Sequence, residues 1–230
     1  MSASPSAQPD AARVASPLDL MRRAKLVPVL TVARAEHAVP LARALVAGGV
    51  WMLEVTLRTP AGADAARAIR DAVPDATVGL GTVLTRRDLE LARELDLPFA
   101  FSPGATPELL DAAADLGVPF VPGVQTASEL MAALARGFGA VKFFPAEPAG
   151  GIPALKALAG PFPGARFCPT GGIAEDAAAR WLALPNVVAV GGSWLAPAAE
   201  VDRGEWDAIT ARARRAMLRL NGRTDTEEPR

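Results

Sequence analysis

The sequence predicts a single α/β domain whose parallel strands close into a (β/α)8 (TIM) barrel, with an additional N-terminal helix. Short apolar runs alternate with alanine-rich helical patterns eight times, each run starting roughly 20 to 26 residues after the last. Most of these runs are continuously apolar, as is typical of parallel strands buried on both faces. The competing fold is an open doubly wound sheet. We favour the barrel because no Gly-x-Gly-x-x-Gly follows the first run and because polar residues recur at many strand ends.

Composition argues against several classes of function. The chain has 230 residues, and its 24 lysines and arginines against 25 aspartates and glutamates give a formal net charge of -1. Without a basic block or a basic stripe interleaved with aromatics, we expect no nucleic-acid partner. The single cysteine, Cys168, excludes an internal disulfide, and the single histidine, His37, removes the usual zinc sites. We therefore expect no metal and a reducing, cytoplasmic location.

The two ends of the chain differ in composition from its middle. Residues 1–16 are rich in alanine, serine and proline, and they lack the apolar core of a signal peptide. Residues 222–230 are polar and charged. We expect a disordered arm over 1–16, one domain over 17–221 and a disordered tail over 222–230. No apolar run is long enough to span a bilayer, so we expect no membrane partner.

The expected elements follow one another without a break. A short amphipathic helix comes first, over Leu18–Lys25. No two-domain boundary interrupts the runs after it, which favours one domain. The strand candidates, in order, are Leu26–Val32, Met52–Leu57, Thr77–Thr82, Phe99–Ser102, Val118–Gly123, Ala140–Pro145, Arg166–Thr170 and Val187–Gly192.

Helix ends are marked between these strands. Thr106 followed by Pro107 is a typical helix start, and Gly117 is a typical helix end. The sequence from Thr126 to Glu129 predicts a capping box, in which each residue bonds the backbone N–H of the other. Marked helix ends between apolar runs support the βα order.

Strand parity divides the second strand between two environments. In a barrel, alternate residues face the interior, and the active site lies at the C-terminal end of the strands. The apolar residues of this strand are expected to face the helices and the polar ones the interior: Leu53, Val55 and Leu57 outside, and Glu54, Thr56 and Arg58 inside. A carboxylate and a guanidinium then share one inner face.

A lysine in the sixth strand is unusual for this chain. The only lysines are Lys25, Lys142 and Lys156, and Lys142 lies in the apolar run AVKFFPAE. An amine, unlike a guanidinium, can lose its proton when desolvated and attack a carbonyl. Parity directs Lys142 inward, roughly across the barrel from the second strand. We therefore expect Glu54, Arg58 and Lys142 to converge on one cavity.

An unreactive interpretation of these charges stays open at this point. Glu54 and Arg58 could form an ion pair that only fills the interior, or Glu54 could neutralise Lys142 as part of the packing. Three charges are costly to bury without a function, which favours an enzyme-like site. Burial and Arg58 favour the neutral amine whereas Glu54 favours the ammonium, and the sequence does not rank these influences.

Two glycine-rich turns follow the last two strands. Gly171 and Gly172 come after the seventh strand, and Gly192 and Ser193 after the eighth. Paired glycines expose backbone amides, and the loops after the last two strands of a barrel often hold phosphate. A double glycine alone is ordinary turn punctuation, but its occurrence in both loops predicts an anion site. Trp194 either walls this site or plugs the barrel end.

Other conspicuous residues are expected to pack rather than react. His37 lies in a helix expected over Glu36–Ala47, where a surface or helix-packing role is expected. Cys168 lacks a histidine partner, which argues against a catalytic thiol. Three tryptophans are also expected to pack: Trp51, Trp181 and Trp206.

Six motifs together resemble one family. They are LEVTLRT (Leu53–Thr59), GLGTVLT (Gly79–Thr85), FSPG (Phe101–Gly104), VKFFPAE (Val141–Glu147), FCPTGGI (Phe167–Ile173) and VGGSWL (Val190–Leu195). In order and spacing, the chain from Leu18 to Leu220 is similar to 2-keto-3-deoxy-6-phosphogluconate (KDPG) aldolase, also known as 4-hydroxy-2-oxoglutarate aldolase.

The resemblance implies a lyase of the Entner-Doudoroff pathway of carbohydrate metabolism. Such an enzyme is a homotrimeric class I aldolase that works through a Schiff base without metal or cofactor. The implied reaction cleaves a phosphorylated keto acid, KDPG, to pyruvate and glyceraldehyde 3-phosphate. A further implied substrate is 4-hydroxy-2-oxoglutarate, which yields pyruvate and glyoxylate.

The resemblance also implies roles for individual residues. Lys142 matches the Schiff-base lysine and Glu54 the general acid and base. Arg58 matches the residue that binds the substrate carboxylate, and Thr82 lines the pyruvate pocket. The remaining matches are a substrate-contacting position, Thr170, and the phosphate site, Gly171, Gly172, Gly192 and Ser193.

One departure and several alternatives accompany this resemblance. Some relatives carry a phosphate-binding arginine near the end of the first strand, where this chain has Thr31, and Arg34 is the candidate substitute. The alternatives are a keto-deoxy-phosphogalactonate aldolase, a sugar-phosphate isomerase or epimerase, and a non-catalytic sugar-phosphate sensor. Metal-dependent epimerases need histidine ligands, and only His37 is present. A sensor would not need a reactive amine.

Overall fold

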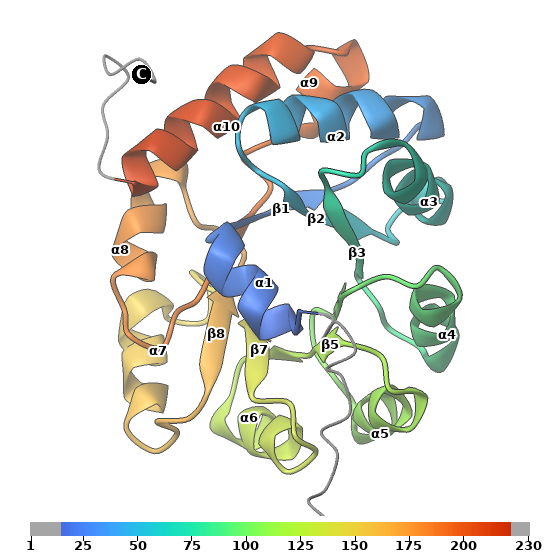
Figure 1. The fold of residues 1–230 in the computed structure, drawn as a ribbon. Coiled ribbons are helices and arrows are strands. Elements are labelled where there is room, and N and C mark those ends of the chain that lie inside the picture. The colour runs from blue at the N-terminus through green and yellow to red at the C-terminus, as the bar shows by residue number, and fades with distance from the viewer. Residues whose placement is uncertain (1–14, 222–230) are drawn as a thin grey trace, which may run out of the picture.

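The parallel strands of the protein curl around a common centre, and helices lie outside them (Figure 1). This computed structural model describes residues 15–221, so the arm expected over 1–16 falls outside the described residues except for its last two, and the tail expected over 222–230 falls outside them entirely. The predicted α/β class with a parallel sheet is confirmed as a curled parallel sheet.

The strands form two sheets, and all described pairings are parallel. One sheet has the order β5-β4-β3-β2-β1-β9 and the other the order β6-β7-β8. Their bounds are β1 Leu26–Leu30, β2 Met52–Thr56, β3 Thr77–Gly81, β4 Ala100–Phe101, β5 Phe120–Val121, β6 Gly123–Val124, β7 Ala140–Phe143, β8 Arg166–Pro169 and β9 Val190–Gly192.

The two sheets approach each other at both edges. Pro122 alone separates β5 from β6, and a proline has no N–H to donate to a strand ladder. The N–H of Gly123 bonds the Ser102 hydroxyl instead, at 3.1 Å. The expected fifth strand is therefore two short strands. At the other edge, isolated bridges join Phe167 to Val187 and Thr170 to Gly191.

The last strand is shorter than expected because the chain changes partner along it. The N–H of Val188 bonds Phe167 in β8, whereas the N–H of Val190 bonds Lys25, which precedes β1. Regular pairing with β1 begins only at Val190, so the expected strand over Val187–Gly192 was too long by three residues. The expected fourth strand was likewise too long, since only its two central residues form β4.

The helices begin and end close to the marked positions. The Thr126–Glu129 capping box is confirmed, with N–H···O distances of 3.3 and 2.8 Å. Gly117 closes its helix with a left-handed φ of 63°. The bounds are α1 Pro17–Ala24, α2 Ala38–Ala47, α3 Gly62–Ala72, α4 Arg86–Glu94, α5 Pro107–Leu116, α6 Ala127–Leu134, α7 Gly151–Ala159, α8 Ala178–Leu182, α9 Ala198–Arg203 and α10 Trp206–Leu220, with 3-10 turns at Ala35–His37 and Glu175–Ala177.

Helix α1 lies across one end of the curled sheet (Figure 1). Ser16 caps its N-terminus, because the Ser16 hydroxyl accepts a hydrogen bond from the N–H of Asp19 at 3.2 Å. Its buried face belongs to an apolar cluster that includes residues near the strand starts, such as Val27, Met52 and Phe99, and extends to Phe101 and Cys168; the α1 members are Leu20, Met21 and Ala24. The N-terminal end of the sheet interior is therefore filled with apolar side chains.

The side chains inside the curled sheet and those between the strands and the helices form separate groups, as the alternation along the strands predicted. Leu53 and Val55 pack in the large cluster with the helices, whereas Met52 packs in the cluster beneath α1. Glu54 and Thr56 are buried among the strands. No described helix is long and apolar enough to cross a membrane.

Candidate active site

The centre of the site is a buried ion pair between strands of the two sheets. Lys142 of β7 donates to both carboxylate oxygens of Glu54 of β2, with Nζ–Oε1 and Nζ–Oε2 distances of 2.7 and 3.0 Å. The two side chains are only 4% and 2% exposed. The predicted convergence of these two residues is confirmed.

Aromatic rings and a glycine shape the space around the pair. The Nζ atom of Lys142 lies 5.3 Å from the ring centre of Phe101 and 5.7 Å from that of Phe144, which is within range for a cation–π interaction. A Cβ atom at Gly81 of β3 would collide with the Glu54 carboxylate. Glycine at this position therefore makes room for the carboxylate.

Arg58 lies outside the interior, so the prediction from strand alternation that it points inward is wrong. Strand β2 ends at Thr56, and Arg58 is an exposed residue of the following turn. Its Nε atom donates to the Thr82 hydroxyl at 3.1 Å, just after β3. Of the three charges expected in the interior, only those of Glu54 and Lys142 are buried, and the exposed guanidinium avoids the cost of desolvation.

A cavity of about 580 Å³ lies at the C-terminal ends of the strands. Its lining includes Phe144, whose ring borders Lys142, but Lys142, Glu54 and Thr82 are not themselves in the lining. Six of the predicted site residues do line it: Arg58, Thr170, Gly171, Gly172, Gly192 and Ser193. The Glu54–Lys142 pair and the two glycine turns are thus connected through Phe144, with the pair behind the cavity wall.

The Gly171–Gly172 turn has a backbone conformation that requires glycine and lines the cavity. The two residues have φ angles of 103° and 79°, which strongly favour glycine. The turn is held by the segment after β7, because Ala146 and Glu147 donate their N–H groups to the carbonyls of Thr170 and Gly171 at 2.8 and 3.0 Å. Successive backbone N–H groups in a turn can form a concave site for an anion.

Glu147 and Trp181 support this turn through a contact that was not predicted from the sequence. The buried indole of Trp181 donates to Glu147 Oε1 at 3.1 Å. A Cβ atom at Gly172 would lie 2.9 Å from the Cβ atom of Glu147, so the side chain lies directly against the turn. The acidic end of the VKFFPAE motif was the available signal. Packing of Trp181 was predicted, but its hydrogen bond was not.

Trp194 forms part of the cavity wall rather than only a plug. Its indole lies so close to Gly192 that a Cβ atom there would collide with the ring nitrogen. That nitrogen is buried and has no hydrogen-bond partner among the described residues. Ser193, between the two, is exposed at the cavity.

Arg34 is directed to α9 instead of the cavity. Its Nη2 atom donates to the carbonyl oxygen of Asp202 at 2.7 Å, and Arg34 is absent from the cavity lining. Thr31, which replaces the arginine of some relatives, lies 3.3 Å from Thr56 between hydroxyl oxygens. The geometry therefore gives no support to Arg34 as a phosphate ligand.

His37 and Cys168 behave as packing residues, as predicted. The imidazole of His37 packs edge to face against Trp206, with ring centres 5.5 Å apart. Burial raises the pKa of the Cys168 thiol to about 12, although the charge of Lys142 opposes the shift. A thiol with so high a pKa is a poor nucleophile near neutral pH.

The chain matches the family model "KDPG and KHG aldolase" over residues 18–212. KHG/KDPG aldolase of Escherichia coli strain K12 is 52% identical over 192 residues, which cover 84% of this chain and 90% of the relative. The 2-dehydro-3-deoxy-phosphogluconate aldolase of Pseudoalteromonas atlantica is 48% identical over 204 residues, or 89% and 95% of the two chains.

A solved structure shows the same fold with a covalent intermediate. It is the KDPG aldolase of Legionella pneumophila, with pyruvate captured at low pH as a covalent carbinolamine. The TM-score is 0.85 at 42% identity, covering 88% of this chain and 98% of the other. A carbinolamine is the adduct that precedes an imine on an amine nucleophile.

Proposed function

Because the chain belongs to the KDPG and KHG aldolase family, we propose that it is a class I aldolase that cleaves KDPG to pyruvate and glyceraldehyde 3-phosphate. The observation that carries this proposal is the buried amine of Lys142, 2.7 Å from the carboxylate of Glu54 beside an open cavity. The second proposed substrate is 4-hydroxy-2-oxoglutarate (KHG), since relatives carry both names.

The first chemical steps form an imine on Lys142. Transfer of a proton from the ammonium to Glu54 leaves a neutral amine, which attacks the C2 ketone to give a carbinolamine. Protonation of the carbinolamine hydroxyl, with Glu54 as the nearest acid, releases water and leaves a protonated imine. The short contact between Nζ and both carboxylate oxygens makes Glu54 the natural proton carrier.

Carbon–carbon cleavage uses the imine as an electron sink. Glu54, directly or through one water, takes the proton of the C4 hydroxyl, and the electrons of the C3–C4 bond move into the iminium. Glyceraldehyde 3-phosphate leaves, and an enamine of pyruvate remains on Lys142. Protonated Glu54 then returns its proton to C3, and water releases pyruvate and restores the amine.

The substrate's two anionic ends match the two polar regions of the cavity. Arg58, fixed by its bond to Thr82, would bind the C1 carboxylate with its planar fork and so direct C2 toward the amine. The phosphate would lie against the glycine turns, with contacts to Gly171, Gly172, Gly192 and Ser193. Thr170, buried between these regions, would contact the chain of the substrate.

The proposal extends to architecture and assembly. We propose that residues 17–221 form one domain and that the two sheets complete one (β/α)8 barrel. The single-residue junction at Pro122 and the isolated bridges Phe167–Val187 and Thr170–Gly191 support such closure. A cytoplasmic homotrimer follows from the family resemblance. Sedimentation equilibrium should then give a mass about three times the chain's 23.8 kDa.

A coupled assay for pyruvate tests the proposed reaction. With lactate dehydrogenase and NADH as reporter, KDPG should be cleaved with a higher kcat/KM than its unphosphorylated analogue or KHG. Replacing Ser193 by alanine should reduce the preference for the phosphorylated substrate roughly tenfold. Absence of pyruvate from all substrates would reject the aldolase and favour an isomerase or a sensor. An unchanged preference in Ser193→Ala would reject the phosphate assignment alone.

A further inference from the structure

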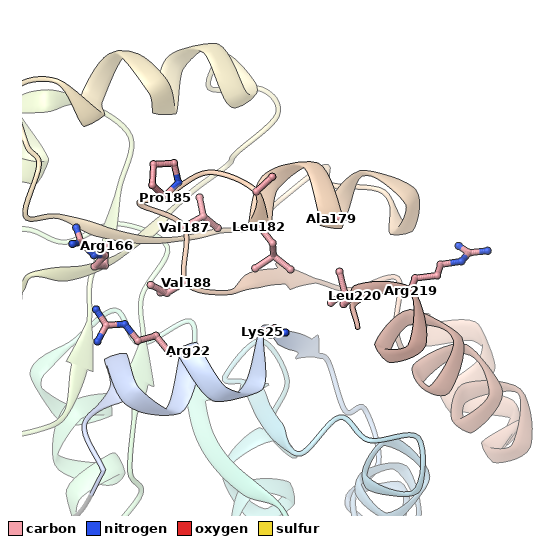
Figure 2. Close-up of a pocket in the computed structure, with 11 residues that line it drawn as sticks. Arg22, Lys25, Arg166, Ala179, Leu182, Pro185, Val187, Val188, Arg219 and Leu220 are labelled. Carbon is pink, nitrogen blue, oxygen red and sulfur yellow. The ribbon is translucent and has the colours of Figure 1, made fainter. Parts of the chain in front are cut away.

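A second cavity lies at the opposite end of the strands from the candidate active site. Its volume is about 660 Å³, against about 580 Å³ for the active-site cavity. Its walls come from the C-terminal ends of α1 and α10 and from α8. The first residue of β8 and the segment between α8 and β9 complete them (Figure 2). No residue of this cavity takes part in the proposed reaction.

The cavity combines positive charge with an apolar surface. Its charged lining residues, among those the structure describes, are all basic: Arg22, Lys25, Arg166 and Arg219. The rest of the lining is apolar: Ala179, Leu182, Ala183, Pro185, Val187, Val188 and Leu220. In a chain with a net charge of -1, four basic groups around one hollow are a local excess.

The basic side chains differ in how far their charge is already balanced. Arg219 bonds Glu175 at 3.0 Å, and Figure 2 shows it extending away from the other three. Arg22 reaches Asp19 only at 4.0 Å, and that carboxylate is more than half exposed. Such an exposed contact contributes little.

The two remaining cations contact only neutral groups among the described residues. Arg166 donates from one nitrogen, Nη1, to the carbonyl oxygens of Pro163 and Ala165, both at 2.9 Å. These bonds hold its position and leave its charge without a carboxylate. Lys25 reaches the neutral side-chain oxygen of Asn221 at 3.5 Å. In Figure 2 the side chains of Arg22 and Arg166 lie at the same end of the cavity, near Val188.

We propose that this cavity binds a small organic anion, with its phosphate or carboxylate held by Arg22 and Arg166. Both oxyanions accept paired bonds from the planar fork of a guanidinium. The body of the ligand would lie on Val187 and Val188. The cavity volume is in the range of small-molecule sites, which are commonly apolar with a few oriented polar groups.

Calorimetric titration of the full chain tests this proposal. The probes are phenyl phosphate and benzoate, which share an apolar ring and differ in the anion. Arg22→Ala and Arg166→Ala should each weaken binding at this site roughly tenfold. The matched control is Arg23→Ala, which removes an exposed arginine of α1 that is outside the cavity lining. It should leave the affinity unchanged.

The candidate active site is a second place where an anion could bind, so the two sites must be separated. Ser193→Ala should not change the binding that Arg22→Ala weakens, and Arg22→Ala should not change kcat for KDPG. The probe that binds with the higher affinity shows whether the site prefers a phosphate or a carboxylate. If the double variant Arg22→Ala/Arg166→Ala binds each probe as tightly as the wild type does, the proposal is overturned. The proposal would also be overturned if Ser193→Ala abolished probe binding while Arg22→Ala and Arg166→Ala did not, because the probe would then bind at the candidate active site.

The acidic end of the chain is the rival occupant. Asp225, Glu227 and Glu228 follow soon after Asn221, whose side chain contacts Lys25. The full-length variant Asp225→Asn/Glu227→Gln/Glu228→Gln tests this possibility. If wild type binds neither probe and this variant binds one in a way that Arg22→Ala abolishes, the chain's own acidic segment fills the cavity. That result would overturn the proposal of an external ligand.

Discussion

Two carboxylates of this protein each accept two short hydrogen bonds from a basic side chain, but in different surroundings. Glu54 binds Lys142 at 2.7 and 3.0 Å, and both side chains are at most 4% exposed. Glu200 binds Arg212 at 2.6 and 2.8 Å, and both are 17–18% exposed. Nearly equal distances therefore occur in an interior pair and in a pair between α9 and α10.

The difference shows that the interior pair is poorly explained by stability. Burying two charges costs more than their attraction usually returns, and a well-packed apolar pair is often at least as stable. The α9–α10 pair keeps contact with water and joins two helices at modest cost. The interior pair also uses lysine where the chain otherwise prefers arginine. A chemical role for the amine accounts for both features.

The substitution Lys142→Arg should have the largest effect. It retains a positive charge beside Glu54 but removes the nucleophilic amine, so KDPG cleavage should fall by at least about 10⁴-fold. Steady-state pyruvate release measures the loss. The control is Lys156→Arg, an exposed lysine on α7, which should keep wild-type activity. Appreciable turnover by Lys142→Arg would argue against imine chemistry.

The substitution Glu54→Gln should remove the proton carrier while leaving the amine. We expect kcat to fall by roughly 10² to 10⁴-fold, the usual range for a general acid and base. Single-turnover kinetics with KDPG locates the slowed step. A kcat within twofold of wild type would mean that another group carries the proton.

The stability of the interior pair can be tested with a double variant. Glu54→Gln alone leaves a buried amine without its partner, and the free energy of unfolding should fall by about 3 kcal/mol. Adding Lys142→Met should restore the lost stability, because the double variant buries neither of these charges. Urea denaturation measures both. A double variant less stable than Glu54→Gln would contradict the comparison.

The substitution Arg212→Ala should have a small effect on stability and none on activity. Removing the α9–α10 pair should lower the free energy of unfolding by about 1 kcal/mol, as for partly exposed pairs. Arg214→Ala, an exposed arginine of the same helix, is the matched control. A loss as large as that of Glu54→Gln would show that the exposed pair is not the weaker of the two.

The buried thiol gives the smallest effect, seen only at alkaline pH. Burial raises the pKa of Cys168 from 9.0 to about 12. Its contribution to stability is thus complete below about pH 9 and is lost as the pH rises toward 12. Between pH 8 and 10 the wild-type protein should lose about 1 kcal/mol more than Cys168→Ala. If urea denaturation shows the same loss of unfolding free energy in wild type and in Cys168→Ala, the thiol ionises in the folded protein.

Local sequence pattern predicted the parts of the site that depend on strand parity. Glu54 and Lys142 lie on inward positions of their strands, and so they meet. Parity could not predict where β2 ends, which is why Arg58 was expected in the interior but lies in a turn.

Contacts between distant segments were also missed. Glu147 and Trp181 are 34 residues apart, and the basic cavity joins residues from both ends of the described chain. No single stretch of sequence contains such a contact. Strand length was misjudged where Pro122 or a change of partner interrupts pairing.

The most direct test of the central claim is to trap the imine. The protein is incubated with pyruvate and sodium borohydride, and the modified peptide is identified by mass spectrometry. We predict a reduced pyruvate adduct on Lys142, absent from Lys25 and Lys156 and abolished by Lys142→Arg. Folded protein with no adduct on Lys142, or with an adduct only on another lysine, would contradict the assignment of Lys142 as the nucleophile.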